Sequence, residues 1–356
     1  MSTYWRIPLL ILAMISLVAG VFAGVARLGW PLPAFWVSHI ADHGILMVPA
    51  FFGAVIGLER AVAIGKGWSY LAPLLSAAGG LLMLAGGPKW LGLWSILAGS
   101  LVFTAASVRV IRVQRALHNW ILLSGVLMLV AGNLLLIVHP HLPPAVLCWI
   151  AFLVLTIAGE RLELSRLVMR SDAKRRVLAL LCLILFISAP AGAVAYPAAE
   201  LCVALTIAAI ALWLVSYDVA RRTVRQTGLP RFTAVCMLAG YFWLLSAGLL
   251  LLVNQLGIIP IARDVPLHAI FLGFVFSMVL GHALIIFPAV TRLKIPYSPL
   301  FYLPLLLLHG TLLLRVTGGL GLAGVYPLGG LLNAVALAAF IVMMVYSVLR
   351  GLFAKS

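Results

Sequence analysis

Apolar residues follow one another in long runs along this chain, separated by short polar stretches or by Pro and Gly. A helix needs about 20 mostly apolar residues to cross a bilayer, so each run is long enough to span one. The pattern predicts twelve spans, at residues 7–26, 40–64, 69–86, 91–109, 120–138, 145–167, 177–195, 198–217, 232–253, 266–291, 299–317 and 326–349. Only Tyr196 and Pro197 separate the seventh run from the eighth, so eleven spans remain an alternative.

The composition supports this interpretation and excludes a soluble globular protein. Hydrophobic residues make up 65% of the 356 residues and charged residues 9%, and the mean hydropathy is +1.20. A chain of this composition is stable only where lipid surrounds most of its surface. We therefore predict an all-α fold, a polytopic transmembrane helix bundle that forms one domain over residues 1–356, with the lipid bilayer as its main partner.

The distribution of positive charge predicts the orientation of the bundle. The net charge is +16, but Lys and Arg are scattered between apolar runs, which is not the pattern of a nucleic-acid-binding domain. Of the 24 Lys and Arg residues, only Arg27, Lys89 and Arg263 fall on one side, Arg315 falls inside the eleventh span, and the other 20 share the opposite side. Cytoplasmic loops retain positive charge, so both termini are predicted to be cytoplasmic, at a bacterial inner membrane.

Two predicted spans carry histidines at the same depth. In the second, His39, His43 and Met47 are spaced four apart and would share one face of an α-helix. In the tenth, His268 lies near the start. Both spans run inward, and His43 and His268 each lie ~5 Å from the outer end at 1.5 Å per residue. Imidazole and thioether groups ligate haem iron or copper, so His43 and His268 are candidate axial ligands of one haem, and His39 and Met47 are further candidate cofactor-binding residues.

Two further histidines lie at the same predicted depth in the membrane. His282 and His309 each lie ~15 Å from the predicted inner surface, near the midplane. Consecutive helices are usually neighbours, so this pair could hold a second metal or relay protons. For every one of these histidines the alternative is an ordinary interfacial or packing group that bonds to a carbonyl. His118, His139 and His141 lie in predicted connections, and we interpret them as ordinary loop residues.

Polar residues also recur toward the inner ends of the second, sixth and tenth spans. Each of these spans has a Gly followed by a polar side chain, Glu59, Glu160 and His282 respectively. The spacing of four spans is compatible with three four-helix repeats. Glu160 and Glu163 could begin a proton path, although neighbouring arginines make an ion pair at a helix end the simpler interpretation.

The second span, with His39 and His43, and the tenth, with L-H-A-I-F-L-G-F and G-H-A-L, resemble the NnrS family of bacterial membrane proteins. That resemblance implies twelve spans, binding of haem and copper, and a link to nitric oxide stress. There is a more distant similarity to haem-copper oxidase core subunits, which implies a low-spin haem on His43 and His268. The sixth and seventh spans contain no histidine, so the three-histidine copper centre of that family is not expected.

Two classes of function follow. The first is a haem b protein, with copper as a possible second metal, that transfers electrons to or from a redox partner or binds a small diatomic such as nitric oxide. The second is a proton-coupled secondary transporter of a small solute, in which His282, His309, Glu160 and Arg315 line a pathway near the midplane. The sequence does not identify catalytic residues for either.

Overall fold

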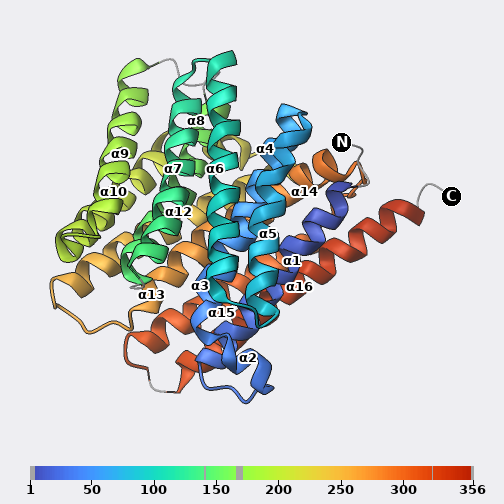
Figure 1. Cartoon of the computed structure of the whole chain (residues 1–356). Helices are drawn as coiled ribbons and strands as arrows, with labels where there is room; N and C mark the ends of the chain where they lie inside the picture. Colours follow the sequence, from blue (N-terminus) through green and yellow to red (C-terminus); the bar gives the residue numbers. More distant parts are fainter. Residues whose placement is uncertain (1–4, 140–141, 166–170, 323, 354–356) are drawn as a thin grey trace. The chain divides into compact units, whose positions relative to one another are not determined.

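Every regular element in the described part of the chain is a helix (Figure 1). The computed structural model describes residues 5–139, 142–165, 171–322 and 324–353. His141, Arg166, Arg170 and Lys355, which contributed to the sequence predictions, lie outside these ranges.

Within the described residues, eleven helices are long and apolar enough to cross a membrane. Seven of them are single α-helices. The seven are α1 (Arg6–Arg27), α6 (Lys89–Val113), α7 (Leu117–Val138), α8 (Leu142–Ser165), α10 (Tyr196–Tyr217), α12 (Gly228–Gln255) and α16 (Val325–Phe353). Two others begin with a short 3-10 helix: η4 (Gly67–Tyr70) is continued by α5 (Leu71–Leu84), and η6 (Pro299–Phe301) is continued by α15 (Tyr302–Gly319). Short helices α2 (Ala34–Ser38) and α11 (Ala220–Thr223) lie in connections.

The two remaining helices contain a π-helical segment, in which the backbone hydrogen bonds reach one residue further than in an α-helix. The second span is built from η2 (Ile40–Asp42), α3 (His43–Ile45), the π-segment η3 (Leu46–Phe52) and α4 (Gly53–Ile64). The tenth is built from α13 (Asp264–His268), the π-segment η5 (Ala269–Phe276) and α14 (Ser277–Thr291). Pro49 lies inside η3, and its missing N–H is one reason why the α-helical ladder is interrupted there.

The uncertain break between the seventh and eighth spans is present in the structure. Helix α9 (Asp172–Ala191) ends there, and α10 begins at Tyr196. Helix α9 is not among the eleven because charged residues occupy its start, at Asp172, Lys174, Arg175 and Arg176. Only residues 177–191 form its apolar part.

The chain forms two compact units. The first comprises residues 1–163 and 182–199, and the second comprises residues 164–181 and 200–356. The expected single domain and the expected four-helix repeats stay predictions.

Small residues bring neighbouring helices of the first unit into close contact. A Cβ on Gly79 of α5 would lie 2.6 Å from the carbonyl oxygen of Gly92 on α6, and a Cβ on Gly92 would meet the Gly79 carbonyl at 2.7 Å. Between α7 and α8, the indole of the fully buried Trp149 donates to Asn133 Oδ1 at 3.1 Å. Small residues and interhelical hydrogen bonds are the usual means of packing helices in lipid, where the hydrophobic effect contributes little.

The second unit is packed in the same way. A Cβ on Gly329 of α16 would lie 2.5 Å from the backbone nitrogen of Arg315 on α15, and the side-chain amide oxygen of Asn333 accepts from Thr311 Oγ1 at 2.7 Å between the same helices. Gly273 of η5 leaves room for the indole of Trp243 on α12.

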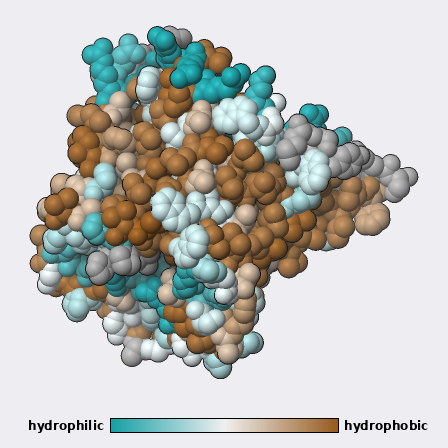
Figure 2. Space-filling view, viewed as in Figure 1, coloured by the Kyte–Doolittle hydropathy of each residue, from teal (hydrophilic) through white to brown (hydrophobic). Residues whose placement is uncertain are grey.

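The outward helix faces are apolar, as lipid contact requires. Leu101, Leu205 and Leu306 are all more than half exposed. Figure 2 shows broad hydrophobic areas along the helices, with hydrophilic residues gathered mainly at helix ends. These apolar helices identify a multi-pass membrane protein.

Candidate functional site

His43 is held by a hydrogen bond to helix α1. Its Nδ1 lies 2.7 Å from the carbonyl oxygen of Gly20. A carbonyl oxygen can only accept, so Nδ1 carries the proton and the lone pair of the neutral ring is on Nε2. Histidines that ligate metals are commonly oriented in this way, with one ring nitrogen donating to a carbonyl or carboxylate and the other binding the metal.

Two glycines of α1 make space for the side chains of the second span. A Cβ on Gly24 would lie 2.8 Å from Cε1 of His43 and 2.9 Å from its Nδ1. A Cβ on Gly20 would lie 2.7 Å from Sδ of Met47. His43 and Met47 therefore both lie against α1, and any larger residue at position 24 would displace the imidazole.

His39 does not share that environment. It precedes η2 rather than belonging to a continuous α-helix, so the spacing of four does not align it with His43. Its Nδ1 bonds to Asp42 Oδ2 at 3.0 Å, and the other Asp42 oxygen accepts from Lys89 Nζ of α6 at 2.9 Å. Asp42 is almost fully buried between these two partners. Asp42 therefore pairs with a residue of another helix, Lys89, as well as with His39.

His268 lies in an environment that resembles that of His43. Its Nδ1 donates to the carbonyl oxygen of Asp264, one turn earlier, at 2.7 Å, and lies 3.7 Å from the Asp264 carboxylate. The lone pair of the neutral ring is again on Nε2. The same carboxylate accepts from Arg315 Nη2 of α15 at 2.7 Å, and the guanidinium lies 5.5 Å from the centre of the Tyr326 ring. Arg315, expected in a midplane pathway, is thus a partner of Asp264.

His282 and His309, the second histidine pair, differ in which ring nitrogen carries the proton. His282 Nδ1 donates to the Met278 carbonyl at 2.9 Å, which again leaves the lone pair on Nε2. His309 Nδ1 instead accepts from the indole Nε1 of Trp243 at 2.8 Å, so its proton is on Nε2. That buried Nε2 has no hydrogen-bond partner among the described residues. The π-segment η5 also separates His268 from His282, so their relative direction is not that of an uninterrupted α-helix.

Charged residues also gather at the predicted inner end of the first unit. Glu160 of α8 lies close enough to Glu59 and Arg60 of α4 to interact with both. His118, predicted to be a loop residue, is instead buried in the first turn of α7, with Nε2 3.7 Å from Glu163 Oε1. This prediction was wrong because α7 begins at Leu117, three residues before the apolar run that marked the span.

Sequence reasoning identified the histidines but missed most of their partners. Lys89, Asp264 and Trp243 each contact a candidate histidine or its carboxylate. The one available signal was that Asp264 lies four residues before His268, a spacing that places both on one helix face. Among the described residues, no three His, Cys, Asp or Glu side chains are grouped so that they could hold a metal ion.

Comparison with known proteins supplies a family but no activity. A family model matches residues 6–349, and its description is a domain of unknown function. No curated protein and no solved structure matches the chain.

Proposed function

The chain belongs to the DUF8744 family, a domain of unknown function, and from that starting point we propose that it is a haem-binding protein of the bacterial inner membrane. The observation that carries the proposal is the matched state of two histidines. His43 and His268 each donate from Nδ1 to a backbone carbonyl at 2.7 Å, so each neutral ring offers the Nε2 lone pair. In this state each imidazole would be able to bind haem iron through Nε2.

The local backbone conformation also favours His43 and His268 as the haem ligands. Each histidine is followed within three residues by a π-helical segment, η3 or η5, and the described residues contain no other π-segment. Such segments account for well under 1% of residues in soluble proteins and are frequent at functional sites.

We assign roles to the residues around the two histidines accordingly. Gly20 and Asp264 orient the imidazoles, Gly24 leaves space for the His43 ring, and Arg315 holds the Asp264 carboxylate. A haem b held by two imidazoles would supply one-electron chemistry, which suits electron transfer with a redox partner or a response to a diatomic such as nitric oxide. His39 and Met47 would lie near the ligands without binding iron.

We also propose the number of spans and the side of the membrane on which the termini lie. Helix α9 would be a twelfth span, with Lys174 near the membrane surface, where its ammonium lies 4.4 Å from the centre of the Tyr217 ring and its carbonyl accepts from Trp213 at 2.9 Å. Aromatic and basic residues are typical of that interface. An even number of spans places both termini on one side of the membrane, and the distribution of Lys and Arg assigns that side to the cytoplasm.

The experiment that tests the function is a titration of haem b into detergent-purified, haem-free protein. We expect saturation at one haem per chain, seen as a Soret band that grows to a plateau. Nitric oxide added to the reduced, saturated protein should then shift that band if the protein binds diatomics. Unchanged spectra with nitric oxide would restrict the function to electron transfer, whereas the absence of saturable haem binding would contradict the proposal.

The close contact between Gly24 and His43 allows a test by a substitution that changes neither proposed ligand. Gly24→Ala adds a Cβ 2.8 Å from the His43 ring, so the ring must move and its bond to Gly20 weakens. We expect haem affinity to fall roughly 10-fold, the lower end of what loss of a ligand-orienting contact costs. Titration of the variant with haem b measures the effect.

The matched control is Gly310→Ala, because Gly310 is also helical and a Cβ there would meet nothing within 4 Å. This variant should bind haem as the wild type does. Equal affinities for all three proteins would show that the space around His43 has no part in haem binding.

A further inference from the structure

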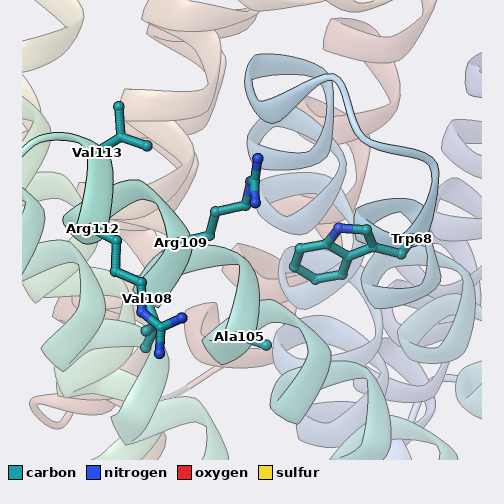
Figure 3. Close-up of a pocket in the computed structure, with 6 residues that line it drawn as sticks. All are labelled: Trp68, Ala105, Val108, Arg109, Arg112 and Val113. Atoms are coloured by element: carbon teal, nitrogen blue, oxygen red, sulfur yellow. The ribbon is translucent and has the colours of Figure 1, made fainter.

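A groove with a volume of about 430 Å³ opens in the first unit beside the predicted cytoplasmic end of α6 (Figure 3). Its lining consists of Trp68 from η4 together with Ala105, Val108, Arg109, Arg112 and Val113 from α6. In Figure 3, Arg109 extends from α6 toward the side of the opening that Trp68 occupies. The groove contains none of the candidate haem ligands, so its role is independent of the proposed function.

The two guanidiniums in this groove have no acidic partner in the described part of the chain. Arg109 and Arg112 are both exposed, are separated by one turn of α6, and form no ion pair among the described residues. The whole chain has only 8 Asp and Glu residues for 24 Lys and Arg. The described residues therefore leave both guanidiniums available to an anionic ligand.

The rest of the lining is apolar and continues toward the membrane interior. Ala105 and Val108 lie one turn before Arg109 and Arg112 along α6, and Leu101, one turn before Ala105, is 52% exposed. On the side of the groove formed by Trp68, Leu71 lies three residues further along the chain, at the start of α5, and is 47% exposed. The Trp68 indole is 40% exposed, and an indole N–H can only donate. A groove that combines these donors with an apolar lining matches an amphipathic ligand with an anionic head.

We propose that this groove binds the headgroup of an anionic phospholipid from the cytoplasmic leaflet. Arg109 and Arg112 contact the phosphodiester, the Trp68 N–H donates to a phosphate or glycerol-ester oxygen, and an acyl chain follows Leu101 and Leu71. Basic pockets with interfacial tryptophan on the cytoplasmic side have the chemistry that recognises such lipids. A soluble phosphate would satisfy the arginines as well, and competition with inorganic phosphate distinguishes the two sources.

Native mass spectrometry of the delipidated, detergent-purified full chain tests the proposal, with phosphatidylglycerol as the probe and phosphatidylethanolamine for comparison. Arg109→Gln with Arg112→Gln should weaken the tightest phosphatidylglycerol site by about 30-fold, roughly fivefold for each charge removed. Trp68→Leu, which keeps both charges, should weaken it by less. Arg109→Lys with Arg112→Lys should retain binding and shows that the double substitution itself is tolerated.

The control removes the same charge elsewhere. Arg222 and Arg225 are also exposed and three residues apart, at the predicted cytoplasmic end of the second unit. Arg222→Gln with Arg225→Gln should leave the tightest site within twofold of the wild type. Equal losses in both double variants, equal affinity for phosphatidylethanolamine, or displacement of the lipid by an equimolar amount of inorganic phosphate would each overturn the proposal.

Discussion

Replacing His268 or His43 with alanine is expected to lower haem affinity by roughly 100-fold or more, so that either variant is purified with little or no Soret absorbance. The loss of an outer partner of a ligand typically costs 10–100-fold in metal affinity, and the loss of the ligand itself must cost at least as much. His43 and His268 are the only two residues proposed to hold the haem. The haem-to-protein absorbance ratio after size-exclusion chromatography measures the effect.

His139→Ala is the matched control, because His139 is exposed at the end of α7 and is not a candidate ligand. Its absorbance ratio should equal that of the wild type. Added imidazole should restore absorbance to His268→Ala, since free imidazole can occupy the vacated coordination position. If His43→Ala and His268→Ala both retain the wild-type spectrum, the assignment of these two ligands is wrong.

Replacing Arg315 with methionine should produce the largest loss of stability. The Arg315 side chain is 8% exposed and its Nη2 bonds to Asp264 at 2.7 Å, so the substitution leaves a carboxylate without its cation. Breaking a buried ion pair typically costs 3–5 kcal/mol. We expect about 3 kcal/mol in the free energy of unfolding, near the lower limit, because the Asp264 side chain is 24% exposed. Denaturation in mixed micelles measures it.

A double variant separates the ion pair from simple packing. Asp264→Asn combined with Arg315→Met removes both charges and should recover most of the lost stability, since no unpaired charge remains. If the double variant is as unstable as Arg315→Met alone, the loss comes from the packing of α15 against α16. The pairing of Arg315 with Asp264 would then contribute little.

The helices could be predicted from the sequence because their solvent is lipid. Each predicted span corresponds to a helix whose ends agree within a few residues, from α1 to α16. The structure has eleven candidate spans where twelve were predicted, and the difference is α9. The charged residues from Asp172 to Arg176 belong to this helix itself. Hydropathy places such residues in a loop, but the backbone can continue as a helix past the membrane surface, where water satisfies the side chains.

The candidate site could be predicted only in part. Spacing identified His43 and His268 but assumed a uniform α-helix, so it could not predict the π-segments η3 and η5 or the separation of His39 from His43. The protonated nitrogen of each ring depends on contacts that are remote in sequence, such as Gly20 with His43 and Trp243 with His309. Sequence spacing carries no information about such tertiary partners.

The reduced-minus-oxidised absorption spectrum of the wild-type protein, purified in detergent from haem-replete cells, tests the central claim most directly. The proposed pair of imidazole ligands predicts a Soret band with sharp α and β bands of low-spin haem b, at one haem per chain. A colourless preparation from such cells, folded as judged by size-exclusion chromatography, would contradict the claim.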